Sequence, residues 1–503
     1  MTDDNTTNNI NNSIAVLLSL DDEKTTSAYF DDLLNSWPLC DVVSALSGNM
    51  KIDQYQFAKK IKESRRLTFS KRPIRTIGTY FYSVSNGGTE RVMSRLCYLW
   101  KQMGFEVVLI TENLGQKDEY NFPEGIKRAI LPGFQKSEGY NYRERAIALQ
   151  NCIEENHIDV VVYHAWELKL ILWDEMVIKA LGAGFVLHCH NIFTKSFFDA
   201  QKDLKELVTP AAIADGIVTL SAVDKTFWRH FSANVYTVNN PFTGNVNEWK
   251  KSSCNGHGVL WIARISPEKR PFDALAIFQR VLKEVPDATL HIVGTAWEKR
   301  YERQFVKTIH NEGLNNHVII HGYQKDVIPF YQDASVFLMT SEFEGYPMTL
   351  QECMASGLPI VMYELPHLTV TKDNPGIFSV KQDNILGAAN AIIELLIDDA
   401  KRKQKGEESR KYFDFLMNYD YENTWNTIFN SIGEKHDMAT SVEEREMMET
   451  LILHQHYGLS KKQKTMQYSE RKTVRTAVRI VSLKDSIHEK GFFYTIKNRK
   501  KKQ

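Results

Sequence analysis

The fold of this chain is decided by the stretch Ser341-Glu342-Phe343-Glu344-Gly345-Tyr346-Pro347-Met348-Thr349-Leu350-Gln351-Glu352. A short apolar run, residues 335–339, comes directly before it, and residues 348–355 have helical character up to Gly357. The stretch therefore predicts a turn that joins the carboxyl end of a parallel strand to a helix. Ligands bind at this edge of open α/β sheets, so the turn is the first candidate site.

The start of the predicted helix is suited to bind an anion. Pro347 in the first turn leaves the backbone N–H groups of Met348, Thr349 and Leu350 pointing outward, and the helix dipole adds positive potential. We therefore expect these groups to form a seat for a diphosphate.

A glutamate flanks the turn on each side. Glu344 lies before the helix, and Glu352 lies further into it, where its carboxylate can accept hydrogen bonds from ribose hydroxyls. The alternative is a solvated helix start that carries two acids by chance, because acids are common at that position.

A second predicted strand end carries cations. Residues 258–263 predict a buried strand that runs into a basic loop, with Arg264 and Lys269 just beyond its end. An arginine fork and a mobile ammonium can neutralise a diphosphate leaving group as its bond breaks. Two ordinary solvated surface charges are the alternative.

Paired glycines lie between a third strand and its helix. Gly87 and Gly88 follow the extended run 77–84 and precede a helix that ends near Gly104. Glycines there permit positive φ and the close approach of a ligand to the backbone, although a plain strand-to-helix turn has the same composition. The G-x-G-x-x-G pattern is missing, which disfavours a dinucleotide cofactor.

These segments and three others resemble one family of enzymes. The residues that carry the resemblance are Gly87-Gly88-Thr89-Glu90-Arg91-Val92, Asp215-Gly216-Ile217-Val218 with Ser221, Arg264 with Ser266-Pro267-Glu268-Lys269, His291-Ile292-Val293-Gly294, Gly322 with Asp326, and Glu344-Gly345-Tyr346-Pro347 with Glu352. In order and spacing they resemble the retaining GT-B glycosyltransferases of family 4. The resemblance implies that a sugar moves from a nucleotide-diphosphate donor to an acceptor with retention of anomeric configuration.

The resemblance also implies roles for single residues. It implies catalytic roles for Glu344, Arg264, Lys269 and His190, with the leaving phosphate itself accepting the proton of the acceptor. It implies that the nucleotide base lies near Gly322. The donor-binding positions that it implies are Gly87, Gly88, Gly322, Tyr323, Tyr346, Met348, Thr349, Leu350 and Glu352. No metal or other cofactor is expected, because the nucleotide sugar is a substrate and the two cations neutralise its phosphates.

Histidines end two predicted strands in the first half of the chain. His164 closes one strand, and His188 and His190 close the next. No second His or Cys cluster stands at a ligand spacing in the sequence and no carboxylate lies nearby, so we expect no metal site. We expect His190 to face the donor and His188 to turn into the sheet, since residues two apart share a face only while the strand continues. A structural histidine is the alternative at both positions.

Alternating strands and helices predict an α/β fold with two Rossmann-like domains, whose parallel sheets face each other across a cleft. We expect a helical, partly disordered N-terminal extension over residues 1–72, an acceptor domain over 73–243 and a nucleotide-sugar domain over 244–435. A helical, basic tail over 436–503 completes the predicted organisation.

Composition agrees with a globular enzyme. The chain has 503 residues, of which 43% are hydrophobic and 25% are charged, and these values are ordinary for a globular protein. No apolar run approaches the ~20 residues that span a bilayer, and the start lacks the basic and apolar regions of a signal peptide, so we expect a cytoplasmic protein. Six cysteines without a C-x-x-C pair indicate buried free thiols.

The charge is unevenly distributed along the chain. Residues 461–503 hold fourteen Lys and Arg against three acids, interleaved with aliphatic and aromatic residues. This pattern favours a peripheral position on an anionic membrane surface, with a solvated disordered end or a nucleic-acid tail as alternatives. Nothing else in the sequence suggests a nucleic-acid fold, so no nucleic-acid partner is expected. Together with the resemblance, the tail indicates a lipid-linked acceptor glycan of polysaccharide biosynthesis, used at the inner face of the membrane.

Three other functions share this architecture. A sugar phosphorylase would use inorganic phosphate, and a nucleotide-sugar epimerase would change the donor without an acceptor. A non-catalytic partner subunit would keep only the fold. The sequence shows no lysine-anchored cofactor signature for a phosphorylase, and it keeps every polar residue expected at the donor site, which argues against a subunit that has lost catalysis.

Overall fold

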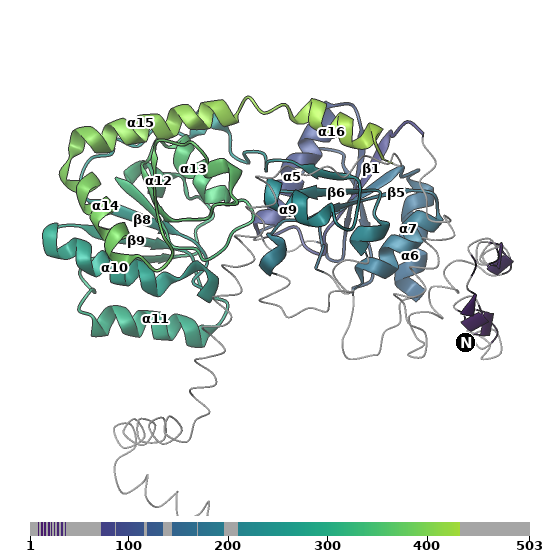
Figure 1. The fold of residues 1–503 in the computed structure, drawn as a ribbon, viewed down its shortest axis with the longest axis horizontal. Helices are drawn as coiled ribbons and strands as arrows, with labels where there is room; N and C mark the ends of the chain where they lie inside the picture. The colour runs from purple at the N-terminus through teal and green to yellow at the C-terminus, as the bar shows by residue number, and fades with distance from the viewer. Residues whose placement is uncertain are drawn as a thin grey trace, which may run out of the picture.

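The computed structural model describes residues 72–432, with gaps at 86, 115–117, 134–142, 168–169 and 196–209, together with scattered residues between 9 and 36. Two α/β domains lie side by side, each with its own parallel sheet (Figure 1). The predicted basic tail lies outside the described residues, as does most of the predicted N-terminal extension. The predicted pair of Rossmann-like domains is confirmed.

The first domain holds a seven-stranded sheet in the order β3-β2-β1-β4-β5-β6-β7. Apolar clusters lie on both faces of this sheet, and most of its strands are therefore near-continuous buried runs of valine, isoleucine and leucine. The strands are β1 (Thr76–Tyr80), β2 (Glu106–Thr111), β3 (Lys127–Ile130), β4 (Val160–Tyr163), β5 (Gly184–His188), β6 (Gly216–Thr219) and β7 (Val235–Thr237). Its helices are α5 (Gly88–Gln102), α6 (Arg143–Glu155), α7 (Ile171–Ala180) and α9 (Ala222–Trp228).

The second domain holds a six-stranded sheet in the order β10-β9-β8-β11-β12-β13, again with apolar clusters on both faces. The strands are β8 (Gly258–Ile262), β9 (Thr289–Val293), β10 (Val318–Gly322), β11 (Val336–Met339), β12 (Ile360–Tyr363) and β13 (Ile377–Val380). The helices are α10 (Pro271–Glu284), α11 (Lys299–Asn311), α12 (Ile328–Asp333), α13 (Met348–Ala355), α14 (Ile385–Ile397) and α15 (Asp399–Leu416), with short 3₁₀ turns at Val246–Glu248, Pro267–Lys269 and Thr369–Thr371.

The strand order of each sheet reverses at one place, between β1 and β4 in the first domain and between β8 and β11 in the second. The crevice outside the carboxyl ends of such a strand pair is where open α/β sheets bind ligands. Three of the four strands at these places are followed by motifs that the sequence singles out: the paired glycines after β1, the basic loop after β8 and the Glu344 turn after β11. The fourth, β4, is followed by His164.

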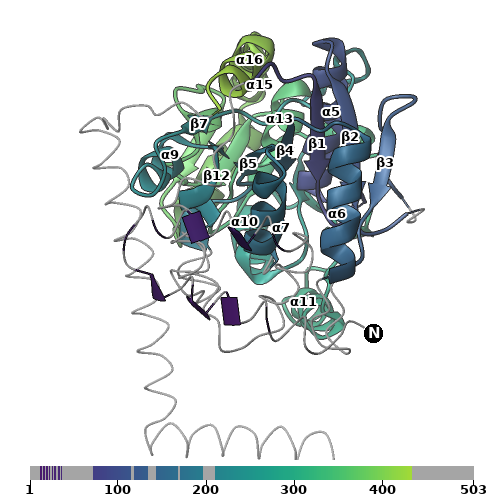
Figure 2. The same ribbon diagram turned by 90° about the vertical axis from the view of Figure 1, so that its right-hand side faces the viewer.

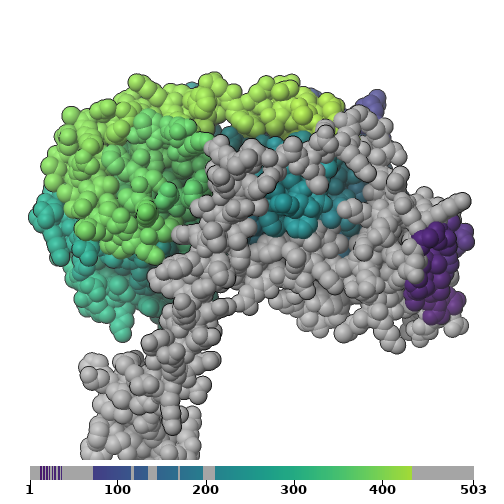
Figure 3. Space-filling model, viewed as in Figure 1, coloured from purple at the N-terminus to yellow at the C-terminus, as the bar shows by residue number. Residues whose placement is uncertain are grey.

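The last described helix, α16 (Tyr421–Asn430), returns to the first domain (Figures 1 and 2). Trp425 meets Trp100 of α5 edge-on at 5.0 Å between ring centroids, and the hydroxyls of Tyr236 and Ser431 lie 2.6 Å apart. The space-filling view shows α15 and α16 running across both domains (Figure 3). The expected boundary placed this helix in the second domain, whereas Trp425, Ile428 and Phe429 of α16 are buried in an apolar cluster of the first domain.

The structure also bears on the cysteines, the N-terminal extension and the apolar helices. The cysteines at positions 97, 152, 189, 254 and 353 are free and buried, as predicted. In the N-terminal extension, Leu33 is buried in the core of the first domain and Tyr29 packs against it. Among the described residues, no helix combines the length and apolarity needed to cross a membrane.

Candidate active site where the two domains meet

Two loops of the second domain are tied together at the point where its strand order reverses. The Trp261 indole N–H donates to the Thr340 hydroxyl (3.0 Å), and that hydroxyl donates to the backbone carbonyl of Lys269 (2.8 Å). The Glu342 amide donates to the carbonyl of Glu268 (2.8 Å). The loop after β8 is thereby fixed against the loop after β11.

The Lys269 ammonium and the Glu344 carboxylate form an ion pair of 2.5 Å across these two loops. Both side chains are largely buried, at 18% and 13% exposure. The Ser341 hydroxyl donates to the same carboxylate oxygen (2.6 Å), and His367 Nε2 donates to the Glu344 backbone carbonyl (2.7 Å). Burial lowers the pKa of His367 to about 4, so this imidazole is neutral. Glu344 is therefore held at both its side chain and its backbone. The sequence alone gave no sign that Ser341 and His367 would hold it.

Arg264 lies at the same strand end but has other partners. Its guanidinium covers the ring of Trp297, with 3.7 Å to the ring centroid, and faces the Glu268 carboxylate at 3.7 Å. Trp297 is highly exposed, so the arginine stacks at the surface. The structure therefore brings Lys269 and Glu344 into direct contact and places Arg264 beside them on a neighbouring part of the loop.

The N-terminus of α13 follows the Glu344 turn. No side chain caps this helix in the described structure, and Pro347 occupies the N-cap position with extended backbone. The Leu350 amide donates to the Pro347 carbonyl (3.1 Å), so it is already used. The amides of Met348 and Thr349 are therefore the better candidates for an anion, and the predicted contribution of Leu350 is weakened.

Gly345 brings the backbone of the second domain against the backbone of the first. A Cβ atom on this residue would lie 2.5 Å from the His190 carbonyl oxygen and 2.8 Å from Asn191 Cα. Real Cβ atoms do not approach backbone that closely, so only glycine lets the turn press against the end of the first-domain strand. Glu344 and His190, both predicted to be catalytic, are consequently neighbours across the domain junction.

Glu352 links the two domains by charge. Its carboxylate is almost fully buried, lies 2.7 Å from the Arg91 guanidinium of the first domain and accepts a hydrogen bond from Tyr331 (2.8 Å). Arg91 also donates to the Thr243 hydroxyl (2.8 Å). The nearby Glu352 carboxylate raises the pKa of Arg91. The sequence suggested a ribose contact for Glu352 but did not suggest this ion pair.

The paired glycines lie at the start of α5. A Cβ atom on Gly87 would collide with the carboxylate of Glu90, which folds back over the helix start, whereas Gly88 has open space around it. Burial raises the pKa of Glu90 to about 7. Gly88 is therefore the glycine that leaves room for a ligand.

The remaining predicted donor positions differ in accessibility. Tyr346 is buried in the second-domain core, and its hydroxyl lies 3.3 Å from the Gln351 amide nitrogen that donates to it, so its side chain supports the turn. Gly322 has a φ of +68°, and its carbonyl accepts from the Gly294 amide (2.8 Å). Tyr323, the next residue, is half exposed at the end of the edge strand β10 and is open to a ligand.

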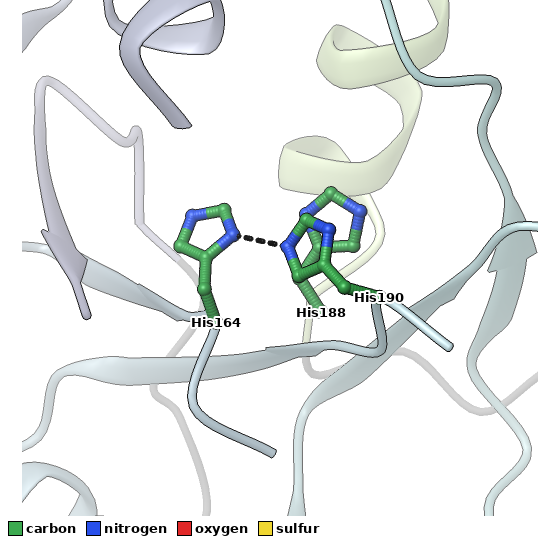
Figure 4. A group of neighbouring side chains, drawn as sticks. All are labelled: His164, His188 and His190. Atoms are coloured by element: carbon green, nitrogen blue, oxygen red, sulfur yellow. Dashed lines mark hydrogen bonds between the residues drawn. The ribbon is translucent and has the colours of Figure 1, made fainter. Parts of the chain in front are cut away.

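His164, His188 and His190 gather at the end of β4 and β5 (Figure 4). The Thr79 hydroxyl lies 3.0 Å from His164 Nε2, and His164 Nδ1 lies 2.7 Å from His190 Nε2. The expectation that His188 turns away from His190 is wrong, because their ring centroids are 4.1 Å apart. The Cys189 amide still bonds to β6, so the extended backbone continues past the end of β5 and keeps both side chains on one face.

Comparison with known proteins agrees with this geometry. The family described as Glycosyltransferase Family 4 matches residues 86–242, and the family described as Glycosyl transferases group 1 matches residues 254–412. The first match lies within the first domain, and the second match lies within the second domain.

Several curated relatives are glycosyltransferases by name. An uncharacterized glycosyltransferase of Haemophilus influenzae is 25% identical over 69% of this chain and 96% of its own length. The poly(glycerol-phosphate) alpha-glucosyltransferase of Bacillus subtilis is 27% identical over 34% of this chain. The matched segment spans only 26% of that relative.

Solved structures share the fold. TarM of S. aureus has a TM-score of 0.57 at 14% identity and covers 71% of this chain and 100% of its own. Anabaena HepE, solved with UDP-glucose, has a TM-score of 0.57 at 17% identity and covers 72% of this chain and 99% of its own. The chain belongs to the GT-B glycosyltransferases of group 1.

The contact at Gly345 gives a direct test of the domain junction. We expect Gly345→Ala to push the turn away from His190 and to lower sugar transfer by about a hundredfold, since shifts of ~1 Å at a reacting centre cost that much. Gly258→Ala is the matched control, because its Cβ would meet nothing closer than 3.8 Å. Steady-state rates and thermal unfolding are measured together. Equal rates in the two variants would show that the close approach does not matter.

Proposed function

We propose that this glycosyltransferase moves a sugar from a nucleotide-diphosphate donor to an acceptor glycan, with retention of configuration at the anomeric carbon. The observation that carries the proposal is the meeting of the domains at Gly345, which follows Glu344 in the chain and packs on the backbone of His190. The charged pair of Lys269 and Glu344 therefore adjoins the first domain at one point.

The cations and the helix start would receive the diphosphate. Bond cleavage leaves additional negative charge on the phosphate, and Lys269, Arg264 and the amides of Met348 and Thr349 would stabilise it as preorganised donors. Before the donor binds, the Glu344 carboxylate already holds the Lys269 ammonium in the loop after β8. When phosphate takes over the ammonium, the Glu344 carboxylate becomes available to accept hydrogen bonds from sugar hydroxyls.

The proton of the acceptor hydroxyl would pass to the leaving phosphate. Attack and departure then share one face of the sugar, which preserves its configuration, and no protein carboxylate has to act as general base. Burial lowers the pKa of His190 to about 3, so a neutral imidazole would contact the donor sugar as a hydrogen-bonding partner.

The nucleoside would lie along the second domain. In this proposal Glu352 accepts hydrogen bonds from the ribose, and the base lies beside Gly322 and the half-exposed Tyr323. Gly88 would allow the backbone of the first domain to approach the phosphates from the other side.

The acceptor is proposed to be a bacterial surface polymer. Three relatives carry such activities in their names: the B. subtilis poly(glycerol-phosphate) enzyme, a poly(ribitol-phosphate) alpha-N-acetylglucosaminyltransferase of Staphylococcus aureus and an amylovoran biosynthesis glycosyltransferase of Erwinia amylovora. The basic residues at 461–503 support a lipid-linked acceptor on the inner, anionic face of the membrane, where the enzyme would be a peripheral cytoplasmic protein.

Removing either cation should nearly abolish transfer. We expect Lys269→Ala and Arg264→Ala to lower the rate by a hundredfold or more, because losing one electrostatic donor costs ~3 kcal/mol of transition-state stabilisation. Lys251→Ala is the matched control, since Lys251 forms an ion pair with Glu407 in which both side chains are about half exposed. Circular dichroism checks folding. Near-normal turnover in both site variants would refute the roles of these cations.

Glu352→Gln should weaken nucleotide binding, because a neutral amide accepts weaker hydrogen bonds from ribose hydroxyls than a carboxylate. Arg91→Gln is the control: it breaks the same ion pair but keeps the carboxylate. Isothermal titration with the nucleoside diphosphate compares the two variants. An equal loss in both would assign the effect to the domain link and contradict the ribose contact.

Transfer should not require a metal ion. The two cations and the α13 amides supply the charge that a divalent ion supplies in other enzymes, so we expect full transfer after treatment with EDTA. Rates are measured with and without the chelator, with a magnesium-dependent glycosyltransferase as the positive control. Loss of transfer in EDTA that magnesium restores would contradict this proposal.

The donor base can be identified by thermal unfolding with UDP, GDP, ADP and their sugars. A ligand at a hundred times its dissociation constant adds ~2.7 kcal/mol of stability, so one base should raise the melting temperature clearly. UDP is expected to do so, since the solved HepE structures contain UDP or UDP-glucose. The absence of a shift with every nucleotide would contradict a nucleotide-sugar donor.

A further inference from the structure

Three histidines from neighbouring strand ends form a compact group, and the proposed glycosyl transfer uses only one of them, His190. His164 follows β4, His188 is the last residue of β5 and His190 lies two residues further on. One nitrogen from each ring lies within 4.8 Å of the others (Figure 4). His164 and His188 are buried, and His190 is partly exposed, so the group has one accessible side.

The hydrogen bonds orient two of the rings toward a common point. Thr79 engages Nε2 of His164 at 3.0 Å, which leaves Nδ1 to face the group. That Nδ1 and His190 Nε2 lie 2.7 Å apart and share a single hydrogen. Metal-binding histidines in proteins are oriented by a hydrogen-bond acceptor at the outer ring nitrogen, and the Thr79 hydroxyl can act as that acceptor here.

No hydrogen bond of this kind orients His188 in the described structure. It is 2% exposed, and neither of its ring nitrogens has a hydrogen-bonding partner in the described structure. An unsatisfied buried polar group costs ~1–3 kcal/mol, so a partner is expected at this place. The His188 ring lies close to both other histidines and is tilted relative to them, with centroid distances of 4.1 Å to His190 and 5.0 Å to His164.

Against the expectation from the sequence that these histidines form no metal site, we propose that His164, His188 and His190 bind one divalent transition-metal ion, with zinc as the preferred ion. Three imidazoles and one open position form the tetrahedral set found in open zinc sites, in which Zn–N distances of about 2.0–2.1 Å separate the nitrogens by about 3.3 Å. The ion would replace the hydrogen shared by His164 and His190, and their nitrogens would separate by roughly 0.6 Å. The fourth position would open on the side of His190.

The chemistry of the three ligands restricts the choice of ion. Within the described part of the chain, this group includes no carboxylate. Imidazole suits zinc, copper, nickel and cobalt, whereas magnesium and calcium take oxygen ligands.

A bound ion would also affect the proposed reaction. His190 is the residue proposed to contact the donor sugar, and an ion would occupy its Nε2. Zinc should therefore inhibit transfer, which is compatible with full activity in EDTA. This consequence rests on the proposed function, whereas the binding of the ion does not.

The test uses the untagged full-length chain after removal of metal with EDTA. Zinc binding is measured by calorimetry, and cobalt binding is measured by the visible absorption of a tetrahedral cobalt(II) site. We expect His188→Phe to weaken the site at least about tenfold, since even outer-shell changes cost 10–100-fold. The double variant His291→Ala/His321→Ala is the matched control. These rings also stack, and His291 Nδ1 lies 3.0 Å from His321 Nε2, but no third histidine completes a metal-binding group with them among the described residues.

The outcomes are distinct. Binding that His188→Phe loses and the control keeps supports the proposal, and magnesium should produce no signal. Absence of zinc and cobalt binding in the unaltered chain, or equal binding in the unaltered chain and His188→Phe, would overturn it. If His188→Phe does not fold by circular dichroism, His164→Asn replaces it in the same comparison. Binding without inhibition of transfer would refute only the shared use of His190, and absence of transfer under all conditions would count against the proposed function alone.

Discussion

The ion pair between Lys269 and Glu344 is the interaction on which the site depends. It joins the ends of β8 and β11, the two strands between which the order of the second sheet reverses. Each charge alone would be costly in a place that is largely shielded from water, and each neutralises the other until a ligand arrives. The Thr340 hydroxyl, which bonds to the Lys269 backbone, fixes the geometry in advance. Preorganisation of this kind is what electrostatic catalysis requires, because the donors need not move as charge develops.

The two domains are connected by contacts of different kinds around this pair. Gly345 lets backbone meet backbone at His190, and Arg91 reaches Glu352 inside the second domain. Helix α16 crosses back and places Trp425 against the first domain. The domain junction is therefore built into the site, and a movement of one domain would change the surroundings of Glu344 and Glu352 together.

The sequence predicted the parts of the fold and site that depend on local pattern. Continuous apolar runs and the residues that end them located the strands, so Glu344 and Lys269 could be placed at strand ends before their contact was known. The contacts that it missed join distant segments. His164 and His190 are 26 residues apart and meet only because β4 and β5 are neighbours, and the pairing of Arg91 with Glu352 depends on how two domains pack. The expectation for His188 was wrong because hydrogen bonding between β5 and β6 continues one residue beyond the end of β5, at the Cys189 amide.

The proposed site holds one diphosphate between the α13 N-terminus and the cations that follow β8. A crystal structure of the full chain with its nucleoside diphosphate tests it most directly. We expect phosphate oxygens within hydrogen-bonding distance of Lys269 Nζ and the Met348 and Thr349 amides, with Arg264 turned from Trp297 toward them. A diphosphate bound elsewhere, with the Lys269–Glu344 pair intact, would contradict it.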